Sequence, residues 1–184
     1  NFLLPGRQIR SVDLLWDRTL AFPDRESFLA RLVGRQIAGV ERRGKYILLR
    51  LDQGYLLIHL RMSGDVRVEP SLDAGGGVRA PALHDRLLLY FEGETRLAFN
   101  DTRKFGRIWL VDSPNQVLKG LGPEPLSDDF TARLLAEGLR KRNRQVKPLL
   151  LDQSFLAGMG NIYTDEALHL AGIHPARQSG ALTD

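Results

Sequence analysis

Apolar and polar residues alternate along most of residues 8–112, which is the repeat expected of β-strands with one buried face. One segment in this part, Arg25–Leu32, instead has the spacing of a short amphipathic helix. Turn residues such as Gln53-Gly54 separate the alternating stretches and favour tight hairpins. The series predicts a β-sandwich or barrel. Its strands are expected at Gln8–Leu20, Ile37–Arg42, Tyr46–Asp52, Tyr55–Leu60, Val66–Val68, Arg86–Phe91, Thr95–Phe99 and Arg107–Val111.

The pattern changes after residue 112. A crossover begins at Ser113-Pro114-Asn115, and residues 121–126 contain two prolines, which is typical of a rigid linker. Ser127 has the chemistry of a helix N-cap, and the two aspartates after it would lie in the first turn, where the helix dipole favours carboxylates. A helix is therefore predicted from Ser127 to about Arg140.

Residues 140–175 have the pattern of two short helices joined by a loop that contains Gly158 and Gly160. Cations beside the free backbone amides of a turn are suited to a polyanion, and we expect a nucleic-acid backbone. Five cations occupy eight positions: Arg140, Lys141, Arg142, Arg144 and Lys147. The apolar face predicted for the second helix consists of Tyr163, Ala167, Leu170 and Ala171.

Together these patterns predict an α+β protein in which an N-terminal β-sandwich domain precedes a helical domain. The boundaries that we expect are residues 1–112 for the β-sandwich, 113–126 for the linker and 127–184 for the helical domain. A chain of 184 residues is long enough to bury a core of useful size.

Composition narrows the possible functions. With 43% hydrophobic and 26% charged residues the chain is in the globular range, and no apolar run approaches the ~20 residues of a membrane span. Cysteine is absent, which excludes disulfides, thiol nucleophiles and cysteine-ligated zinc, and His169 and His174 lack ligand spacing, so we predict no metal site. The net charge is +4, and cations gather in Arg42–Lys45, in Arg103–Arg107 and after Arg140, as in a DNA-binding groove.

Four segments carry a recognisable pattern, in this order: Arg42–Tyr46, Ile58–Gly64, Asn100–Gly106 and Leu121–Pro175. Together they resemble the formamidopyrimidine-DNA glycosylase (Fpg/Nei) family of DNA repair enzymes. Within the fourth segment, Lys147-Pro148 and Gly160-Asn161-Ile162-Tyr163 are similar to the Fpg branch. The resemblance implies that residues 140–175 form the family's helix–two-turn–helix element, which grips DNA phosphates.

The resemblance implies a bifunctional glycosylase and AP lyase that excises oxidised purines, namely 8-oxoguanine and formamidopyrimidines, from double-stranded DNA. Such an enzyme flips the damaged base out of the duplex, because the glycosidic carbon is unreachable inside the stack. An amine then attacks that carbon, and β/δ-elimination nicks the strand. The resemblance also implies a monomer that acts in the bacterial cytoplasm without a membrane partner.

Two features of the family pattern are not found in this sequence. The family's nucleophile is an N-terminal proline followed by a catalytic glutamate, whereas this chain begins at Asn1. The family also ends in a four-cysteine zinc finger, whereas this chain stops at Asp184 without cysteine. We therefore expect a fragment, truncated at both ends, that is inactive without its nucleophile. No cofactor is expected in this chain, and zinc is expected only in the full-length protein.

Lys45 matches the family's proton donor for the elimination step, on a β-hairpin, although an isolated lysine there would be a solvated strand end. Met62, Arg103 and Phe105 match the trio that fills the gap left by the flipped base, for which inserted apolar wedges are suited. The alternative for Met62 and Phe105 is plain core packing. The full trio favours the Fpg branch over the Nei branch.

His84 resembles the family's DNA-contacting histidine, although a histidine before a strand is usually a surface residue. Arg142 and Lys147 match positions that contact phosphate or the base site, and Asn161 matches a phosphate-binding asparagine that could equally be a helix N-cap. His59 is expected to be a structural histidine inside a strand.

Two other functions stay open. The first is a non-catalytic DNA-binding protein that keeps the family scaffold without the nucleophile. The second is a Nei-type enzyme that acts on oxidised pyrimidines, which the trio of Met62, Arg103 and Phe105 disfavours.

Overall fold

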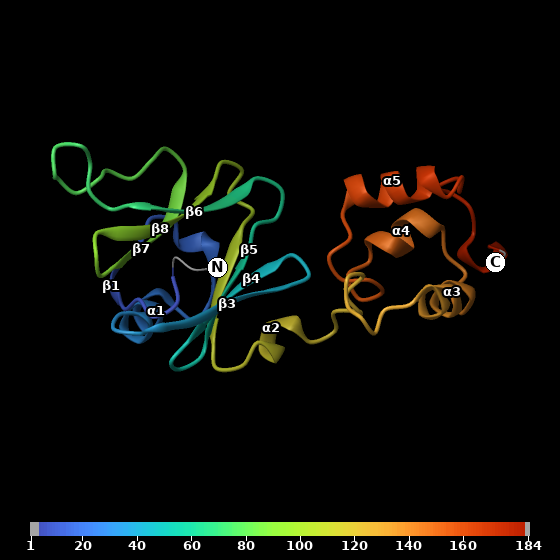
Figure 1. Ribbon diagram of the computed structural model, residues 1–184, viewed down its shortest axis with the longest axis horizontal. Coiled ribbons are helices and arrows are strands. Elements are labelled where there is room, and N and C mark those ends of the chain that lie inside the picture. The colour runs from blue at the N-terminus through green and yellow to red at the C-terminus, as the bar shows by residue number, and fades with distance from the viewer. Residues whose placement is uncertain (1–3, 183–184) are drawn as a thin grey trace. The chain divides into compact units, whose positions relative to one another are not determined.

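The computed structural model describes residues 4–182. The chain divides into two compact units, Asn1–Val117 and Leu118–Asp184, each of which is described by itself. The first unit contains two β-sheets and the second is helical, which confirms the α+β class (Figure 1). The predicted boundaries at residues 112 and 127, with a linker between them, stay a prediction.

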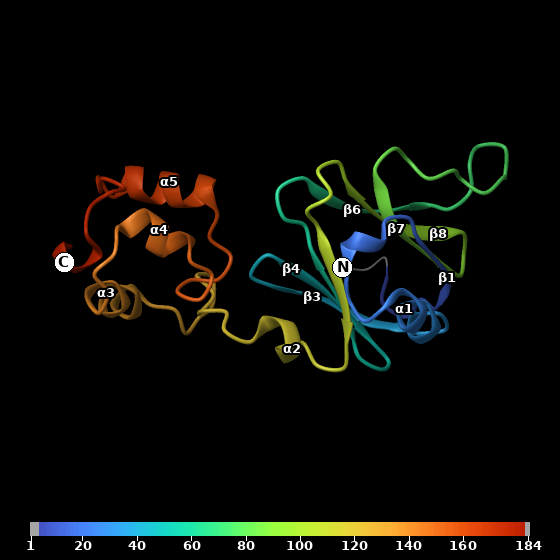
Figure 2. The ribbon, with the colours of Figure 1, turned by 180° about the vertical axis from the view of Figure 1, so that it is seen from behind.

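The first unit is a sandwich of a four-stranded and a five-stranded sheet (Figures 1 and 2). The four-stranded sheet has the order β1-β7-β8-β6 and is antiparallel throughout. The five-stranded sheet has the order β2-β9-β5-β4-β3, and only β2 runs parallel to its neighbour. The strands are β1 (Ile9–Leu14), β2 (Leu20–Phe22), β3 (Ile37–Arg43), β4 (Tyr46–Leu51), β5 (Tyr55–His59), β6 (Gly64–Pro70), β7 (Asp85–Phe91), β8 (Thr95–Asp101) and β9 (Arg107–Val111).

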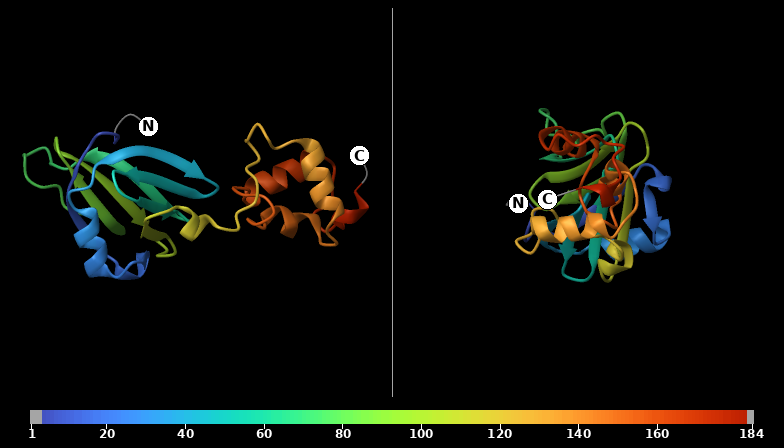
Figure 3. Two further views of the ribbon diagram at one scale, coloured as in Figure 1. Left: turned by 90° about the horizontal axis from the view of Figure 1, so that it is seen from below. Right: turned by 90° about the vertical axis from the view of Figure 1, so that its right-hand side faces the viewer.

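One apolar core joins the two sheets, because the inward side chains of both contribute to it. Helix α1 (Arg25–Leu32) packs beside β1 and adds the fully buried Phe28 and Leu32 (Figure 3). The Asp24 carboxylate caps this helix by accepting from the Ser27 amide at 2.9 Å. The sequence had predicted the bounds of α1 and of β9 correctly.

The first predicted strand, Gln8–Leu20, is wrong as a single element. It consists of β1, a short 3-10 turn at Asp17–Thr19, and the start of β2. The cause is topological: β1 pairs with β7 in one sheet whereas β2 pairs with β9 in the other, so the chain must turn between them.

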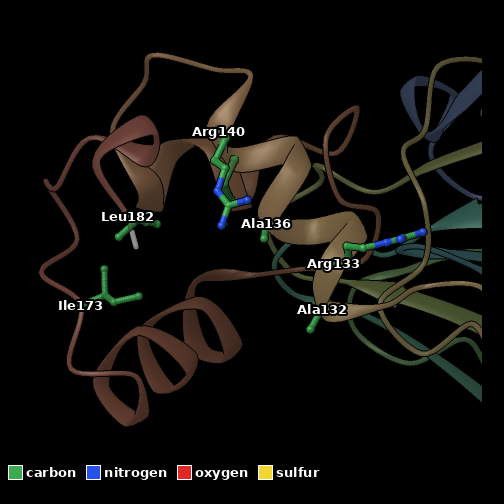
Figure 4. Close-up of a pocket in the computed structure, with 7 residues that line it drawn as sticks. Ala132, Arg133, Ala136, Arg140, Ile173 and Leu182 are labelled. Atoms are coloured by element: carbon green, nitrogen blue, oxygen red, sulfur yellow. The ribbon is translucent and has the colours of Figure 1, made fainter. Parts of the chain in front are cut away.

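The second unit contains α3 (Ala132–Arg140), α4 (Val146–Leu151) and α5 (Asn161–Leu170), and the one-turn α2 (Asn115–Leu118) precedes it. Its core consists of α4 residues, the loop residues Phe155 and Leu156, and Leu168 of α5. A cavity of about 490 Å³ is lined by residues of α3 together with Ile173 and Leu182. Figure 4 shows how these lining residues lie. Arg140, one of the five cations predicted to face a polyanion, lines this cavity, whereas Arg142, Lys147 and Asn161 do not.

Two helix predictions in this unit need correction. Helix α3 begins at Ala132 and not at Ser127, because the Thr131 hydroxyl caps it by accepting from the Leu134 amide at 3.2 Å. Ser127 instead closes a turn ahead of the helix, where its hydroxyl accepts from the Asp129 amide at 3.4 Å.

The buried face of α5 is also different from the predicted one. Thr164 and Leu168 are buried, whereas Tyr163 and Leu170 are 73% and 84% exposed. The buried stripe is shifted by one residue, which is a rotation of about 100° about the helix axis. Packing against α4 chooses this stripe, and the apolar periodicity of the sequence does not reveal it.

Candidate nucleic-acid interface

Strand register brings four of the predicted segments to one end of the β-sandwich. Tyr46 of β4 pairs with His59 of β5, and His59 pairs with Arg107 of β9. In the other sheet, β8 pairs Asn100 with Asp85 of β7 and Asp101 with Gly64 of β6. The Lys45 turn, the Met62 loop, the His84 segment and the Arg103–Phe105 loop therefore all leave their strands at this end.

The side chains of the predicted trio are at the surface. Met62 is 73% exposed and Phe105 is 49% exposed, so core packing is wrong for both. The Arg103 guanidinium carbon is 5.1 Å from the centre of the Phe105 ring, which is a cation–π contact. Exposed apolar side chains at loop tips are available for insertion into a partner.

Three non-glycine residues in these loops have left-handed backbone conformations, which side chains other than glycine rarely adopt. Arg61 has φ 56°, His84 has φ 76° and Lys104 has φ 61°. Such residues are held in place only when surrounding contacts over-determine them, and they concentrate at functional sites.

Several contacts in these loops come from Asp101, which is fully buried and whose amide donates to the His84 carbonyl. Its Oδ1 accepts from the Ser63 hydroxyl at 2.6 Å and from the Arg103 amide at 3.2 Å, and its Oδ2 accepts from the Gly106 amide at 2.7 Å. The Arg103 amide also donates to Ser63 Oγ at 3.3 Å. We call these contacts the Asp101 network. It joins the loop that bears Met62 to the loop that bears Arg103 and Phe105.

The charge on Asp101 follows from this network. Burial alone would raise the pKa of the carboxyl, but the Ser63 hydroxyl and the amides of Gly106, Arg103 and Phe105 outweigh burial and lower it. Asp101 is therefore a carboxylate at neutral pH. Sequence reasoning missed this residue, because nothing in its local pattern separates a buried strand-end carboxylate from a solvated one.

His84 is half-buried just before β7 and is fixed on its backbone side. Its carbonyl accepts from the Asp101 amide at 3.0 Å, and the carbonyl of the preceding Leu83 accepts from Asn100 Nδ2 at 2.9 Å. The following residue, Asp85, has a fully buried carboxylate that accepts from Arg67 at 3.0 Å. His84 is therefore tied to the same strand end as the Asp101 network.

Lys45 follows Gly44 in the two-residue turn between β3 and β4. Partial burial lowers the pKa of its ammonium, which makes the group a stronger acid. It lines an open cavity of about 300 Å³. The other lining residues are Arg42, Gly44, Tyr46, Ile47, Leu60 and Arg61.

His59 lies beneath this turn and is 8% exposed. Its Nδ1 accepts from the Arg61 amide at 3.0 Å, and its ring meets the Tyr46 ring edge-on at 4.6 Å between centres. Burial first, then the charges of Arg61 and Lys45, lower the pKa of His59 to about 4. The structural role expected of His59 agrees with these contacts, and the ring is neutral at physiological pH.

The cations of the helical unit are engaged within their own unit. Lys147 Nζ is 2.6 Å from the Asp165 carboxylate, and both side chains remain partly exposed. The guanidinium of Arg142 lies 4.7 Å above the Phe155 ring and donates to the Gly138 carbonyl at 3.1 Å. Lys147 and Arg142, which are predicted to contact phosphate, therefore lie at the surface, and each already has a partner within the helical unit.

Arg144 is a third cation that is engaged within the helical unit. It donates to the Asp152 carboxylate at 2.7 Å, and Asp152 also accepts from the Ser154 hydroxyl at 2.6 Å. The Ser154 hydroxyl first, and then Arg144, lower the pKa of Asp152 to about 2.

Asn161 is exposed and is the first residue of α5. The residue at the N-cap is Gly160, so the alternative role of Asn161 as the cap is wrong. The amides of the first helical turn have no acceptor within the helix and are suited to an anion. Asn161 would add a side-chain amide to them.

Within residues 4–182, no three His, Asp or Glu side chains come together as the ligands of a metal ion would. In the same part of the chain, no helix has the length and apolar character that crossing a membrane requires.

Comparison with known proteins agrees with this geometry. Residues 1–108 match the model of the formamidopyrimidine-DNA glycosylase N-terminal domain, and residues 121–184 match that of the formamidopyrimidine-DNA glycosylase H2TH domain. A formamidopyrimidine-DNA glycosylase of Chloroflexus aggregans is 49% identical over 172 residues, which cover 91% of this chain and 60% of that protein.

Solved structures are similar as well. Lactococcus lactis Fpg in complex with FAPY-dG-containing DNA has a TM-score of 0.88 at 37% identity, over 99% of this chain and 68% of that one. MutM in complex with carbocyclic 8-oxo-G-containing DNA has a TM-score of 0.87 at 38% identity, over 99% of this chain and 67% of that one. This chain spans 58% to 66% of the length of the curated relatives that it matches.

Proposed function

The chain belongs to the formamidopyrimidine-DNA glycosylase family, and on that premise we propose that it supplies the DNA-gripping and base-replacing parts of a DNA repair glycosylase. The substrate class is double-stranded DNA that carries an oxidised purine, either 8-oxoguanine or a formamidopyrimidine. Two similar structures are complexes with DNA that contains FAPY-dG or carbocyclic 8-oxo-G, which supports this class. The complete enzyme would also nick the strand by β/δ-elimination, as a monomer in the bacterial cytoplasm.

The observation that carries this proposal is the exposure of Met62 and Phe105 on loops that the Asp101 network makes rigid. A flipped base leaves a gap in the stack, and unstacking costs a few kcal/mol, which inserted apolar side chains offset. Arg103, stacked on Phe105, brings a cation to the same point. Rigidity matters because a wedge that is ordered beforehand loses little entropy on insertion.

Lys45 is the proposed proton donor of the elimination step. The lowered pKa of its ammonium brings the group nearer to neutral pH, where proton transfer is most efficient. The family resemblance gives the nucleophile as an N-terminal proline, so no described residue is proposed for that role, and the chemistry proposed for this chain ends with that proton.

The helical unit is proposed to hold the phosphate backbone through Arg142, Lys147 and Asn161. Its first-turn amides and these side chains provide donors and charge without reading base identity. The unit therefore contributes affinity, and the loops of the β-sandwich contribute recognition of the damaged site.

The family's four-cysteine zinc finger does not fit the residues of this chain, which contains no cysteine. No step proposed here passes through zinc. We propose that zinc belongs to the complete protein only, as the family resemblance implies.

The proposal is tested by measuring the affinity of this chain for two duplexes by fluorescence anisotropy. One duplex contains a tetrahydrofuran abasic analogue, and the other is the same sequence undamaged. We expect tighter binding to the abasic duplex and loss of that preference in the double variant Met62→Ala, Phe105→Ala. Val78→Ala, which removes a side chain that is 74% exposed elsewhere in the unit, is the matched control. Equal affinities for both duplexes in the unmodified chain would contradict the proposal.

The enzymatic half is tested with the complete encoded polypeptide, whatever residues it places before Asn1. Borohydride is added to its complex with an 8-oxoguanine duplex, and a covalent adduct is expected. Binding without an adduct would identify a non-catalytic DNA-binding protein instead.

A further inference from the structure

Arg86 is a buried cation that no part of the proposed function uses. It is the second residue of β7 and is 8% exposed. Arginine is almost never so buried unless it is paired, and this guanidinium has two neutral partners at one end of the sandwich. Its Nε donates to the Asp101 carbonyl at 2.8 Å, and one terminal nitrogen lies 3.3 Å from Nδ1 of His84.

The contact with His84 fixes the tautomer of the imidazole ring. A guanidinium has five N–H donors and no acceptor, so Nδ1 must accept. In the neutral ring the hydrogen is then on Nε2, on the side of the ring away from Arg86. Phosphate and sugar oxygens accept hydrogen bonds, and this tautomer offers them a donor.

The contact with Asp101 fixes where that donor lies. The Asp101 amide N–H donates to the His84 carbonyl at 3.0 Å, and the Asp101 carbonyl accepts from Arg86 Nε. Backbone and side chain of His84 are thus both tied to the residue whose carboxylate holds Ser63 and the Arg103 loop. His84 keeps its left-handed backbone conformation because these contacts over-determine it.

We propose that Arg86 is a positioning residue for DNA recognition: it holds the His84 ring with Nε2–H as the outward donor, in register with the loops that bear Met62, Arg103 and Phe105. The proposal rests on the proposed function in one respect, the contact of His84 with DNA. The tautomer itself is independent of DNA.

The first experiment is therefore carried out without DNA. Long-range ¹H–¹⁵N correlation spectra at pH 7.5 report the tautomer of each of the four histidines, and His84→Gln assigns the His84 signals. We expect an Nε2–H tautomer with an accepting Nδ1 for His84, and averaging between both tautomers in Arg86→Met. His59, whose Nδ1 accepts from the Arg61 amide, is an internal reference that stays unchanged.

Arg96→Met is the matched control. Arg96 is 1% exposed in the neighbouring strand β8, with Glu69 and two carbonyls as partners and no histidine contact. We expect Arg96→Met to destabilise the fold while leaving the His84 tautomer unchanged. If Arg86→Met does not fold, Arg86→Lys replaces it, because a single ammonium cannot reproduce the planar fork between two partners. An unchanged His84 tautomer in the folded variant would overturn the proposal.

The second experiment is a double-mutant cycle on affinity for the abasic-analogue duplex. Arg86→Met and His84→Gln should each weaken binding by about fivefold to tenfold, as expected for loss of one hydrogen bond. The double variant should be no weaker than His84→Gln alone, because Arg86 acts through His84. Additive losses would mean that Arg86 is merely structural and would overturn the proposal. Unchanged affinity of His84→Gln, with the tautomer result intact, would instead remove the DNA contact assigned to His84.

Discussion

The two units hold their candidate DNA contacts in opposite ways. In the β-sandwich, Met62, Arg103 and Phe105 extend from loops whose backbone is fastened to a buried carboxylate. In the helical unit, Lys147 and Arg144 lie on the surface in ion pairs with Asp165 and Asp152. The first arrangement cannot change without breaking buried hydrogen bonds, whereas the second consists of contacts that solvent already reaches.

The difference matches two physical tasks. Exposed ion pairs contribute about 0–1 kcal/mol each, so replacing a carboxylate with a DNA phosphate costs little. Phosphates occur along the whole duplex, and a grip on them needs charge more than exact geometry. A wedge for one missing base needs a fixed position, because misplacement by about 1 Å can remove most of its benefit. The ordered loops are thus suited to the gap left by a missing base, and the exchangeable cations of the helical unit are suited to phosphates.

The comparison is tested most strongly by Asp101→Asn. An amide at this position offers one acceptor where the carboxylate offers two, and its NH₂ group faces other donors. We expect the β-sandwich to lose about 3 kcal/mol of unfolding free energy.

Both tryptophans, Trp16 and Trp109, lie in this unit, so their fluorescence during urea denaturation reports on it alone. The control is Asp65→Asn. The Asp65 carboxylate is 62% exposed and lies 3.7 Å from Arg67 Nε, so this variant should change stability by less than about 0.5 kcal/mol. Equal effects of the two variants would mean that the network does not hold the loops.

A second test separates chemistry from grip. In the complete protein, Lys45→Ala should slow strand nicking by about a hundredfold, as loss of general acid catalysis does, with duplex affinity nearly unchanged. Lys147→Ala should weaken binding and leave nicking per bound complex unchanged. Gel-resolved single-turnover kinetics and anisotropy measure the two quantities. Should Lys45→Ala abolish binding and spare nicking per bound complex, the assignment of Lys45 would be wrong.

Acid should weaken the β-sandwich through His59. Because the pKa of this ring is lowered to about 4 in the folded protein and is near 6.5 when unfolded, the unfolded chain binds its proton first. The contribution is complete above pH 6.5 and is lost as the pH falls toward 4. Between pH 7 and pH 4.5, the unmodified protein should lose about 1–3 kcal/mol of unfolding free energy through this ring. That loss should be absent in His59→Gln, whose amide oxygen can still accept from the Arg61 amide. An identical pH profile for both proteins, followed by tryptophan fluorescence, would contradict this expectation.

The smallest effect is expected in the helical unit. Asp165→Asn frees Lys147 for phosphate and should raise duplex affinity by about twofold to fivefold, with a steeper dependence on salt. Glu166→Gln, on the same helix, changes net charge equally without an ion pair to Lys147 and is the control. If both variants gain the same affinity, general charge and not the exchange of one ion pair explains the result.

The sequence predicted most strands of the β-sandwich, because short apolar runs are separated by turn residues such as Gln53-Gly54. Alternation alone would not have been enough, since β5 and β7 are buried at nearly every position. The sequence-based prediction failed where two local structures have similar free energies. Ser127 and Thr131 are both acceptable caps, and only the packed structure chooses Thr131. The Asp101 network was invisible for a different reason. Ser63, His84, Arg86 and Asp101 meet through pairing between strands, and strand register is a long-range property. The surface positions of Met62 and Phe105 likewise depended on where their loops end relative to the core.

Fastening three loops to one residue, Asp101, has a consequence for engineering and for natural variation. A substitution in one of three segments affects the other two, although they are far apart in the sequence. The segments are residues 60–64, 83–86 and 101–106. A loop transplanted from a relative with another lesion preference would arrive without its anchor, and the remaining loops would lose theirs. Altered specificity would therefore require coordinated changes in all three segments, with Ser63, Arg86 and Asp101 left unchanged within them as the common frame.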